Sequence, residues 1–262
     1  MTRLSRRAYL KAHAAIGAWF VLPRFAIGRA GASANSKINV ALIGAGGIAR
    51  TCYRDCQQQN VVAIADVDQL RGAPGFEAFP QAKRYKDFRR MLDVHGDKLD
   101  LVIVSTPDHT HFPATYAAME RRIAVHTQKP LTHNIWQART LLKAYHKFGV
   151  QTVMGNQGHT FEGMRQIREW YEAGLIGEVR EVHAWTNRTT NNTLNAKITL
   201  PAEPIPDTLD WDLWTGPAKL NPYNSKLCPS GWRWWWDYGL GGLGDIGCHT
   251  LDIPKYAMGL GY

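Results

Sequence analysis

Lys37-Ile38-Asn39-Val40-Ala41-Leu42-Ile43-Gly44-Ala45-Gly46-Gly47-Ile48-Ala49 is an apolar run that ends in glycines. Such a run predicts a strand, a tight turn and the start of a helix. The spacing Gly44-x-Gly46-x-x-Ala49 matches the dinucleotide fingerprint, in which the first glycine makes the turn and the second lets the backbone approach a pyrophosphate. A glycine-rich corner that binds no ligand would have a similar sequence, so this motif alone does not establish nucleotide binding.

A second apolar run supports the nucleotide hypothesis. Val61-Val62-Ala63-Ile64-Ala65 is followed by Asp66, and a carboxylate roughly 20 residues after the first glycine binds the ribose 2′-hydroxyl. An acid at this position would repel the 2′-phosphate of NADP. We therefore expect NAD rather than NADP, with its binding site formed at this point of the chain by Gly44, Gly46, Gly47, Ile48 and Asp66.

The first 34 residues have the features of an export signal. Ser5-Arg6-Arg7-Ala8-Tyr9-Leu10-Lys11 resembles the twin-arginine signal, an apolar stretch follows from Ala12 to Leu22, and Ala32-Ser33-Ala34 offers a small-x-small cleavage pattern. Residues 1–34 are thus predicted to be a signal peptide. Its removal is expected to leave a periplasmic protein that is not attached to the membrane. A basic amphipathic helix is the alternative, whereas a membrane anchor is disfavoured because arginines interrupt the apolar run.

The net charge of +9 comes mostly from this segment, which holds six basic and no acidic side chains. The remaining 228 residues carry 25 basic against 22 acidic side chains, a net charge of +3. They contain no basic stripe, so the sequence gives little support to nucleic-acid binding. Their number suffices for one large or two modest domains.

Further along, apolar strands alternate with helical patterns. Strands are predicted at 99–104, 123–127 and 150–154, helices at 85–94, 113–121 and 135–148, and a loop at 72–75. This alternation predicts βαβ units and a parallel sheet, whose ligands bind at the carboxyl ends of the strands. Polar clusters follow three of the predicted strands, at 106–111, 128–130 and 155–159.

Four motifs resemble, in order and spacing, those of the Gfo/Idh/MocA oxidoreductases: Gly44-Ala45-Gly46-Gly47-Ile48-Ala49, Thr106-Pro107-Asp108-His109-Thr110-His111, Gln128-Lys129-Pro130-Leu131 and Gly241-Gly242-Leu243-Gly244-Asp245-Ile246-Gly247-Cys248-His249. Two more stretches, 155–159 and 209–217, are similar to the exported branch of that family. The resemblance covers essentially all of residues 37–262.

The resemblance implies two domains. Residues 35–155 are expected to form an NAD-binding Rossmann domain, and residues 156–262 the first part of an incomplete α/β substrate domain built on an open, mostly antiparallel sheet. Within this second part a helix is predicted at 161–173, a strand at 178–186 and a helix at 245–258. Family members usually continue further, so we expect either a fragment or a chain that depends on a partner; many associate as homo-oligomers through this sheet.

By resemblance, Lys129 is the lysine of the Glu-Lys-Pro motif, close to the nicotinamide and to the substrate hydroxyl. An ammonium there can hydrogen-bond the hydroxyl and stabilise the alkoxide from which hydride leaves. Gln128 replaces the family's glutamate, which changes the charge balance around Lys129. The alternative is a surface lysine before a turn proline.

Asp245 and His249 are spaced i to i+4, so on a helix they project from one face. Imidazole can take a proton near neutral pH, and a neighbouring carboxylate can orient it. In the family the matching pair lines the substrate pocket, with His249 as the proton acceptor. Alternatively, Asp245 caps the helix and His249 has a packing role.

The remaining candidate residues are less specific. Asp108, His109 and His111 lack a further metal ligand of convincing spacing, so no metal is predicted; Asp108 or Thr110 is expected to cap the following helix. Thr106, Pro107 and His111 are assigned to the cofactor. His159 and Trp235 are assigned to the substrate, with a plain loop residue and a core aromatic as the respective alternatives.

Together with the family resemblance, these residues predict an NAD-dependent oxidoreductase that acts on a secondary hydroxyl of a sugar, polyol or derivative. Export implies a tightly held cofactor, because free nicotinamide nucleotide is not regenerated outside the cytoplasm. One alternative is an NAD-dependent glycosidase that works by oxidation, elimination and re-reduction. Another is a truncated protein that binds nucleotide or carbohydrate without turnover.

Overall fold

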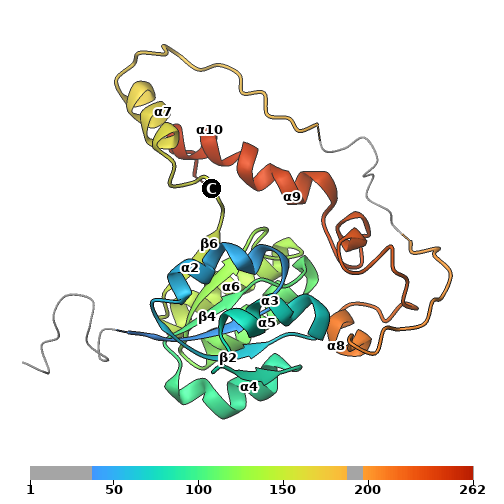
Figure 1. Ribbon diagram of the computed structural model, residues 1–262. Helices are drawn as coiled ribbons and strands as arrows, with labels where there is room; N and C mark the ends of the chain where they lie inside the picture. The colour runs from blue at the N-terminus through green and yellow to red at the C-terminus, as the bar shows by residue number, and fades with distance from the viewer. Residues whose placement is uncertain (1–36, 188–196, 262) are drawn as a thin grey trace, which may run out of the picture. The chain divides into compact units, whose positions relative to one another are not determined.

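The computed structural model describes residues 37–187 and 197–261 (Figure 1). The predicted signal peptide, residues 1–34, lies outside the described residues. The fingerprint stretch forms strand β1 (Asn39–Ile43) and then a 3₁₀ helix, η2 (Gly47–Cys52), which continues as the short helix α2 (Tyr53–Cys56). The predicted strand and turn are therefore present, and the helix after them opens with a 3₁₀ segment.

β1 lies inside a six-stranded sheet in which every neighbouring pair is parallel. The strand order is β3-β2-β1-β4-β5-β6, the doubly wound order of a Rossmann fold. The other strands are β2 (Asn60–Ala65), β3 (Lys83–Tyr85), β4 (Leu101–Val104), β5 (Ala124–Gln128) and β6 (Thr152–Gly155). The carboxyl ends of all six strands therefore meet at one edge.

Side-chain alternation sends successive residues of each strand to opposite faces of the sheet. Ala41 and Ile43 face the cluster covered by helices α4 (Phe88–His95), α5 (Asp108–Glu120) and α6 (Ile135–Phe148). Val40 and Leu42 face a smaller cluster that includes Phe76 and Phe79. Because both faces of the central strands β1 and β4 are buried, these strands are almost entirely apolar, as is typical of a parallel sheet.

The predicted loop at 72–75 is wrong, because these residues lie inside helix α3 (Gln69–Ala78). The Asp68 carboxylate caps this helix by accepting hydrogen bonds from two backbone amides of its first turn. A Cβ on Gly72 would lie 2.9 Å from the Asp66 Cβ, and one on Gly75 would lie 2.6 Å from the Ala45 Cβ. These glycines allow close packing of a helix against the fingerprint loop rather than a turn.

Several boundaries also differ from the sequence expectation. Helix α5 begins at Asp108, five residues before the predicted start. Its N-cap is Pro107, without a side-chain cap, so the prediction that Asp108 or Thr110 caps this helix is wrong. Strand β3 was not predicted. Helix α6 has the predicted bounds: the Asn134 side chain caps its start, and Gly149 at φ 65° ends it.

The expected open, mostly antiparallel sheet is absent from residues 156–187 and 197–261. The sheet that the structure contains has six strands, all parallel, and the predicted strand at 178–186 is an extended, largely exposed segment that forms no strand within the described part of the chain. A strand is defined by hydrogen bonds to a neighbouring strand, and residues 156–187 and 197–261 provide none beside this segment. The apolar residues of this segment alone therefore do not make a strand here.

The chain after β6 contributes helices and loops. The helices are α7 (Glu162–Glu172), α8 (Trp211–Thr215), the 3₁₀ helix η4 (Gly231–Trp234), α9 (Gly241–Thr250) and α10 (Asp252–Ala257). The helix predicted at 245–258 is thus two helices, and α10 packs against α7 (Figure 1). Aromatic residues, among them Trp211, Trp214 and Tyr238, form a third buried cluster. No helix within the described residues is long and apolar enough to span a membrane.

Candidate functional site: a nucleotide pocket beside a lysine–aspartate pair

The fingerprint loop needs glycine because other backbone lies against it. Gly44 has φ +82°, and a Cβ there would lie 2.7 Å from the carbonyl oxygen of Ser105. A Cβ on Gly46 would lie 2.5 Å from the carbonyl oxygen of Arg71. Any side chain at either position would displace this backbone, so the two glycines build a cradle that is open to a ligand on its other side.

Asp66, at the end of β2, is bonded to the same loop. Its Oδ2 accepts the backbone N–H of Ala45 at 2.8 Å, and its Oδ1 accepts the backbone N–H of Asp68 at 2.9 Å. Burial raises the pKa of this carboxyl, while the two N–H groups act in the opposite direction. The carboxylate therefore ties the cradle to the start of α3.

A pocket opens over the cradle. Of the residues predicted to bind the cofactor, seven line it: Gly44, Gly46, Gly47, Ile48, Asp66, Thr106 and Pro107. The Ser105 and Thr106 hydroxyl groups are buried and make no hydrogen bond within the described structure. Unpartnered hydroxyls in a cradle that excludes side chains fit a polar ligand that reaches the backbone, so these residues fit a dinucleotide.

Sequence reasoning missed the part of this pocket that comes from beyond the Rossmann sheet. Four residues around η4 line it: Cys228, Pro229, Trp232 and Arg233. The Arg233 guanidinium lies over the Trp232 ring, 4.2 Å from its centroid. Arg233 adds a positive charge to the pocket that the fingerprint loop also lines. Because Arg233 is far from Gly44 in sequence, no local pattern predicts that the two residues share a pocket.

His111, predicted to bind the cofactor, lies behind the pocket wall. Its ring is almost fully buried, with Nε2 2.7 Å from the Thr106 carbonyl oxygen and Nδ1 2.7 Å from the Pro130 carbonyl oxygen. Burial lowers the pKa of this imidazole. In this position His111 supports the loops that carry Thr106 and Lys129 and does not line the pocket.

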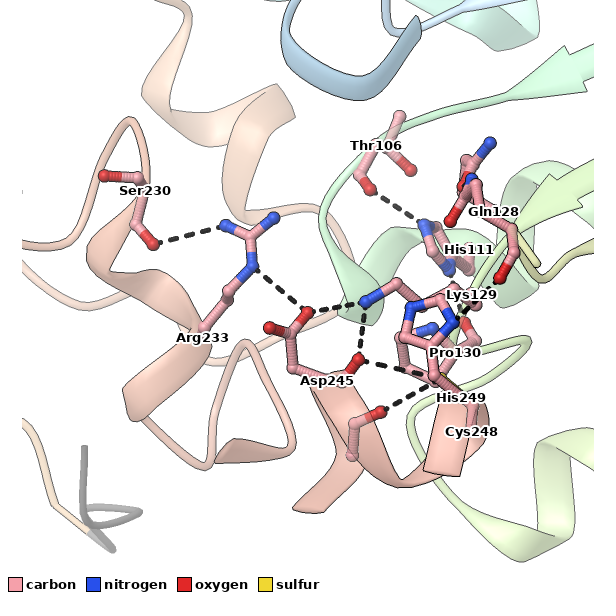
Figure 2. Close-up of polar contacts among 12 residues, drawn as sticks. Thr106, His111, Gln128, Lys129, Pro130, Ser230, Arg233, Asp245, Cys248 and His249 are labelled. Carbon is pink, nitrogen blue, oxygen red and sulfur yellow. Dashed lines mark hydrogen bonds and ion pairs between the residues drawn. The ribbon is translucent and has the colours of Figure 1, made fainter. Parts of the chain in front are cut away.

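Lys129 and Asp245, which are far apart in sequence, form a half-buried ion pair (Figure 2). The Lys129 ammonium donates to Asp245 Oδ1 at 2.8 Å and also to the Asp245 backbone carbonyl. Arg233 Nε lies 3.5 Å from the same Oδ1. One carboxylate thus pairs with two cations, Lys129 just after β5 and Arg233 in the nucleotide pocket. Lys129, which was also predicted to bind the cofactor, is not among the residues that line this pocket and is connected to it through Asp245 and Arg233.

His249 lies one helical turn after Asp245 on α9, as the i to i+4 spacing predicts. Its Nδ1 is 3.2 Å from the backbone carbonyl oxygen of Gln157, in the loop after β6. His159, in the same loop, is paired through Nδ1 with Asp252 Oδ2 at 2.8 Å. The loop at 155–159 and helices α9 and α10 therefore form one polar cluster around the predicted proton acceptor.

Of the tryptophans at 232–236, Trp232 and Trp235 pack in or against the buried aromatic cluster. Trp232 is buried in the aromatic cluster, and Trp235, assigned to the substrate, is half-buried and packs against that cluster. Trp236 is exposed and lies near His133, with ring centroids 5.9 Å apart. The substrate role of Trp235 stays a prediction.

Sequence analysis also missed the surroundings of Asp108. Its side chain is buried at 4% exposure, and its carboxyl accepts the backbone N–H of Leu240, directly before α9. Burial, with a further contribution from Asp245, raises its pKa to about 7, although Arg233 and Lys129 act against the shift. Asp108 therefore belongs to the charge cluster around Lys129.

Next to it, His109 holds two segments. Its Nε2 lies 2.9 Å from the Trp214 carbonyl oxygen and its Nδ1 lies 3.2 Å from the Tyr238 carbonyl oxygen. The ring is buried, which lowers its pKa to about 4 and keeps it neutral at neutral pH. His109 therefore connects the Rossmann domain to the chain that leads into α9.

Known proteins resemble this chain over part of their length. D-glucoside 3-dehydrogenase of Escherichia coli is 26% identical over 233 residues, 87% of this chain and 56% of that protein. Inositol 2-dehydrogenase of Renibacterium salmoninarum is 26% identical over 56% of this chain and 45% of its own, and D-apiose dehydrogenase of Paraburkholderia graminis is 30% identical over 52% and 37%. The chain thus spans about half the length of the curated relatives that it matches.

Among solved structures, myo-inositol 2-dehydrogenase of Lactobacillus plantarum superposes with a TM-score of 0.50 at 19% identity, over 55% of this chain and 43% of that one, which shows likeness of fold. Two sequence models of one family match nearly all of the described chain. Residues 38–156 match "Oxidoreductase family, NAD-binding Rossmann fold", and residues 162–261 match "Oxidoreductase family, C-terminal alpha/beta domain". With the cradle, the pocket and the Lys129–Asp245 pair in place, the chain belongs to the Gfo/Idh/MocA family of oxidoreductases, and its N-terminal part is that family's NAD-binding Rossmann domain.

Proposed function

We propose that this chain is an NAD-dependent oxidoreductase that acts on a secondary hydroxyl of a sugar, polyol or derivative. The observation that carries the proposal is the Lys129–Asp245 pair, in which Asp245 also pairs with Arg233 of the nucleotide pocket and lies one helical turn before His249. The names of the relatives, which act on inositol, D-apiose and D-glucosides, support this substrate class.

Lys129 is suited to binding and polarising a hydroxyl. The described residues account for two of its three N–H groups, both bonded to Asp245, so the third can donate to a substrate oxygen. Because Asp245 also pairs with Arg233, its carboxylate is held in place and fixes the direction of the ammonium. A fixed positive charge stabilises the developing alkoxide without any rearrangement of the site.

His249 is suited to taking the hydroxyl proton. A backbone carbonyl can only accept a hydrogen bond, so the contact with Gln157 requires the proton of the neutral ring to be on Nδ1. The lone pair of the ring is then on Nε2, and an imidazole lone pair is suited to general-base catalysis. Bound NAD would supply the hydride acceptor, held by the cradle around Gly44 and by Asp66.

Kinetics of a matched pair of variants test this function. Lys129→Met should lower turnover of a polyol by about 10²–10⁴-fold, the range for a missing proton-transfer or polarising group, whereas Lys143→Met, at an exposed lysine of α6, should not change it. The assay follows absorbance of reduced nicotinamide with inositol, D-apiose and methyl D-glucosides. A Lys129→Met variant that oxidises its substrate at the parent rate would refute the assignment.

Analysis of the products of the same reactions separates the oxidoreductase from the alternatives. An oxidoreductase yields a keto-sugar, detected by mass spectrometry, whereas a glycosidase that works by transient oxidation releases an aglycone. A protein that binds without turnover yields neither product while still showing a thermal shift with NAD. The dehydrogenase names of the relatives favour the first outcome.

We also propose that the protein is exported by the twin-arginine route and retains NAD. The support is the sequence of residues 5–11 and the cleavage pattern at 32–34. Replacing Arg6 and Arg7 by lysine should leave the protein in the cytoplasm. Mass and absorbance analysis of the periplasmic form should find NAD without added nucleotide, and a periplasmic form free of NAD would refute the retained cofactor.

A further inference from the structure

Gln128 stands where the resemblance leads us to expect glutamate, and the structure shows what its amide contacts. It ends β5, is 5% exposed, and its Oε1 accepts a hydrogen bond from Gln157 Nε2 at 2.8 Å. Its partner across the ladder is Gly155, where a Cβ would lie 2.8 Å from Gln128 Nε2. The glycine therefore leaves the room that lets the buried amide of Gln128 reach the loop after β6.

The same loop residue contacts the proposed proton acceptor through its backbone. The carbonyl oxygen of Gln157 lies 3.2 Å from His249 Nδ1. A side-chain amide that anchors Gln157 to the sheet thus also restrains the peptide group that faces the imidazole. The connection runs from Gln128 at the end of β5, through Gln157, to His249 on α9.

A second residue of the loop, Asn156, attaches it to both α9 and α10. Asn156 Nδ2 donates to the Cys248 carbonyl oxygen at 2.9 Å and to Asp252 Oδ2 at 2.9 Å. Asn156 is therefore bonded to the residue before His249, while the carbonyl group of Gln157 faces the His249 ring. With the backbone of α9 held in this way, the Gln157 carbonyl favours the ring proton on Nδ1 of His249.

We propose that the Gln128–Gln157 amide pair sets the tautomer of His249, with Gln157 as a positioning residue. The importance of the tautomer for turnover rests on the proposed function, in which Nε2 of His249 takes the substrate proton. An amide at position 128 can both donate and accept, so it can pair with Gln157 without adding a charge beside Lys129. Gln128, which stands in place of the glutamate, then serves as the hydrogen-bonding partner of Gln157.

The test measures the tautomer directly, without cofactor or substrate. Long-range ¹H–¹⁵N NMR on the full chain labelled with [¹⁵N]histidine distinguishes the two neutral tautomers, and the His249 signal is assigned by its loss in His249→Gln. Gln157→Met and Gln128→Met should each lower the ratio of the Nδ1–H to the Nε2–H form of His249 by about threefold to tenfold, as expected for one neutral hydrogen bond. Gln58→Met, at an exposed position, should leave the ratio unchanged.

Charge variants separate pairing from a general structural role. Gln128→Glu still accepts from Gln157, and Gln157→Glu can accept from Gln128 after its amide turns over, so each single variant should keep the parent tautomer. The double variant sets two acceptors against each other and should lose it. Parent-like ratios in both methionine variants, or in the double glutamate variant, would overturn the proposal. If the ratios change as expected while no sugar or polyol is oxidised, the positioning holds and the proposed function fails.

Discussion

Asp108 should make the protein less stable as the pH rises toward neutrality. Its carboxyl is buried beside Asp245, and its pKa is raised from 3.8 to about 7. The folded state therefore binds a proton more tightly than the unfolded state does. For an acid with a raised folded-state pKa, stability falls as the pH rises from the unfolded-state pKa to the folded-state pKa, and no further loss follows above it.

The two pKa values give the size of the effect. Each pH unit between them costs at most about 1.4 kcal/mol, so Asp108 should contribute a loss of about 2–3 kcal/mol between pH 5 and pH 8. Arg233 and Lys129 already offset part of the burial cost in the folded protein, and this is included in the shift. Asn at position 108 can still accept the N–H of Leu240 but does not titrate.

Urea unfolding of the parent and of Asp108→Asn at pH 5 and pH 8 measures this contribution. The parent should lose about 2–3 kcal/mol more of its unfolding free energy over this range than the Asn variant does. Asp97→Asn, at an exposed position, should titrate like the parent and serves as the control. An equal pH dependence in the parent and in Asp108→Asn would refute the reasoning and place the Asp108 carboxyl in a more polar environment.

Three further substitutions test the cradle and its supports. Gly44→Ala places a Cβ 2.7 Å from the Ser105 carbonyl oxygen at a positive φ, so it should cost about 2–4 kcal/mol and weaken NAD binding, measured by thermal melts and calorimetry. Asp68→Ala removes the cap of α3 and should cost about 1 kcal/mol in urea unfolding, with NAD affinity as a second readout. His109→Phe removes the one N–H that the neutral ring can donate to the Trp214 or the Tyr238 carbonyl and should cost about 1–3 kcal/mol; parent-like stability would show that this contact contributes nothing net.

Much of the Rossmann domain could be predicted from sequence because its signals are local. The apolar runs at β1, β2, β4 and β5 and the cap and stop of α6 are recognised over a few residues, and the fingerprint glycines lie next to one another in the chain. The misassigned loop at 72–75 shows the limit of such signals. Glycine is common both in turns and where a helix packs closely, and only the neighbouring Ala45 and Asp66 distinguish the two.

The candidate site could be predicted only in part. Lys129, Asp245 and His249 were expected from motif resemblance, and Asp66 from its spacing after Gly44. Arg233 and Asp108 were not expected to join them, because their role depends on η4 and α5 meeting at the end of β5. No sequence pattern within η4 or α5 predicts that these two helices lie close together.

By itself, then, the sequence determined most strands and helices of the Rossmann domain, the position of the nucleotide cradle and the face of α9 that carries Asp245 and His249. These follow from backbone preferences and from spacings along a single element. The tertiary structure decided which residues distant in sequence form ion pairs and which hydroxyl groups of the pocket have no hydrogen-bond partner within the described residues. It also decided that 178–186 forms no strand in the described chain. Ion pairs, burial and strand pairing are properties of neighbours in space, and a strand without a paired neighbour has no hydrogen bonds to define it.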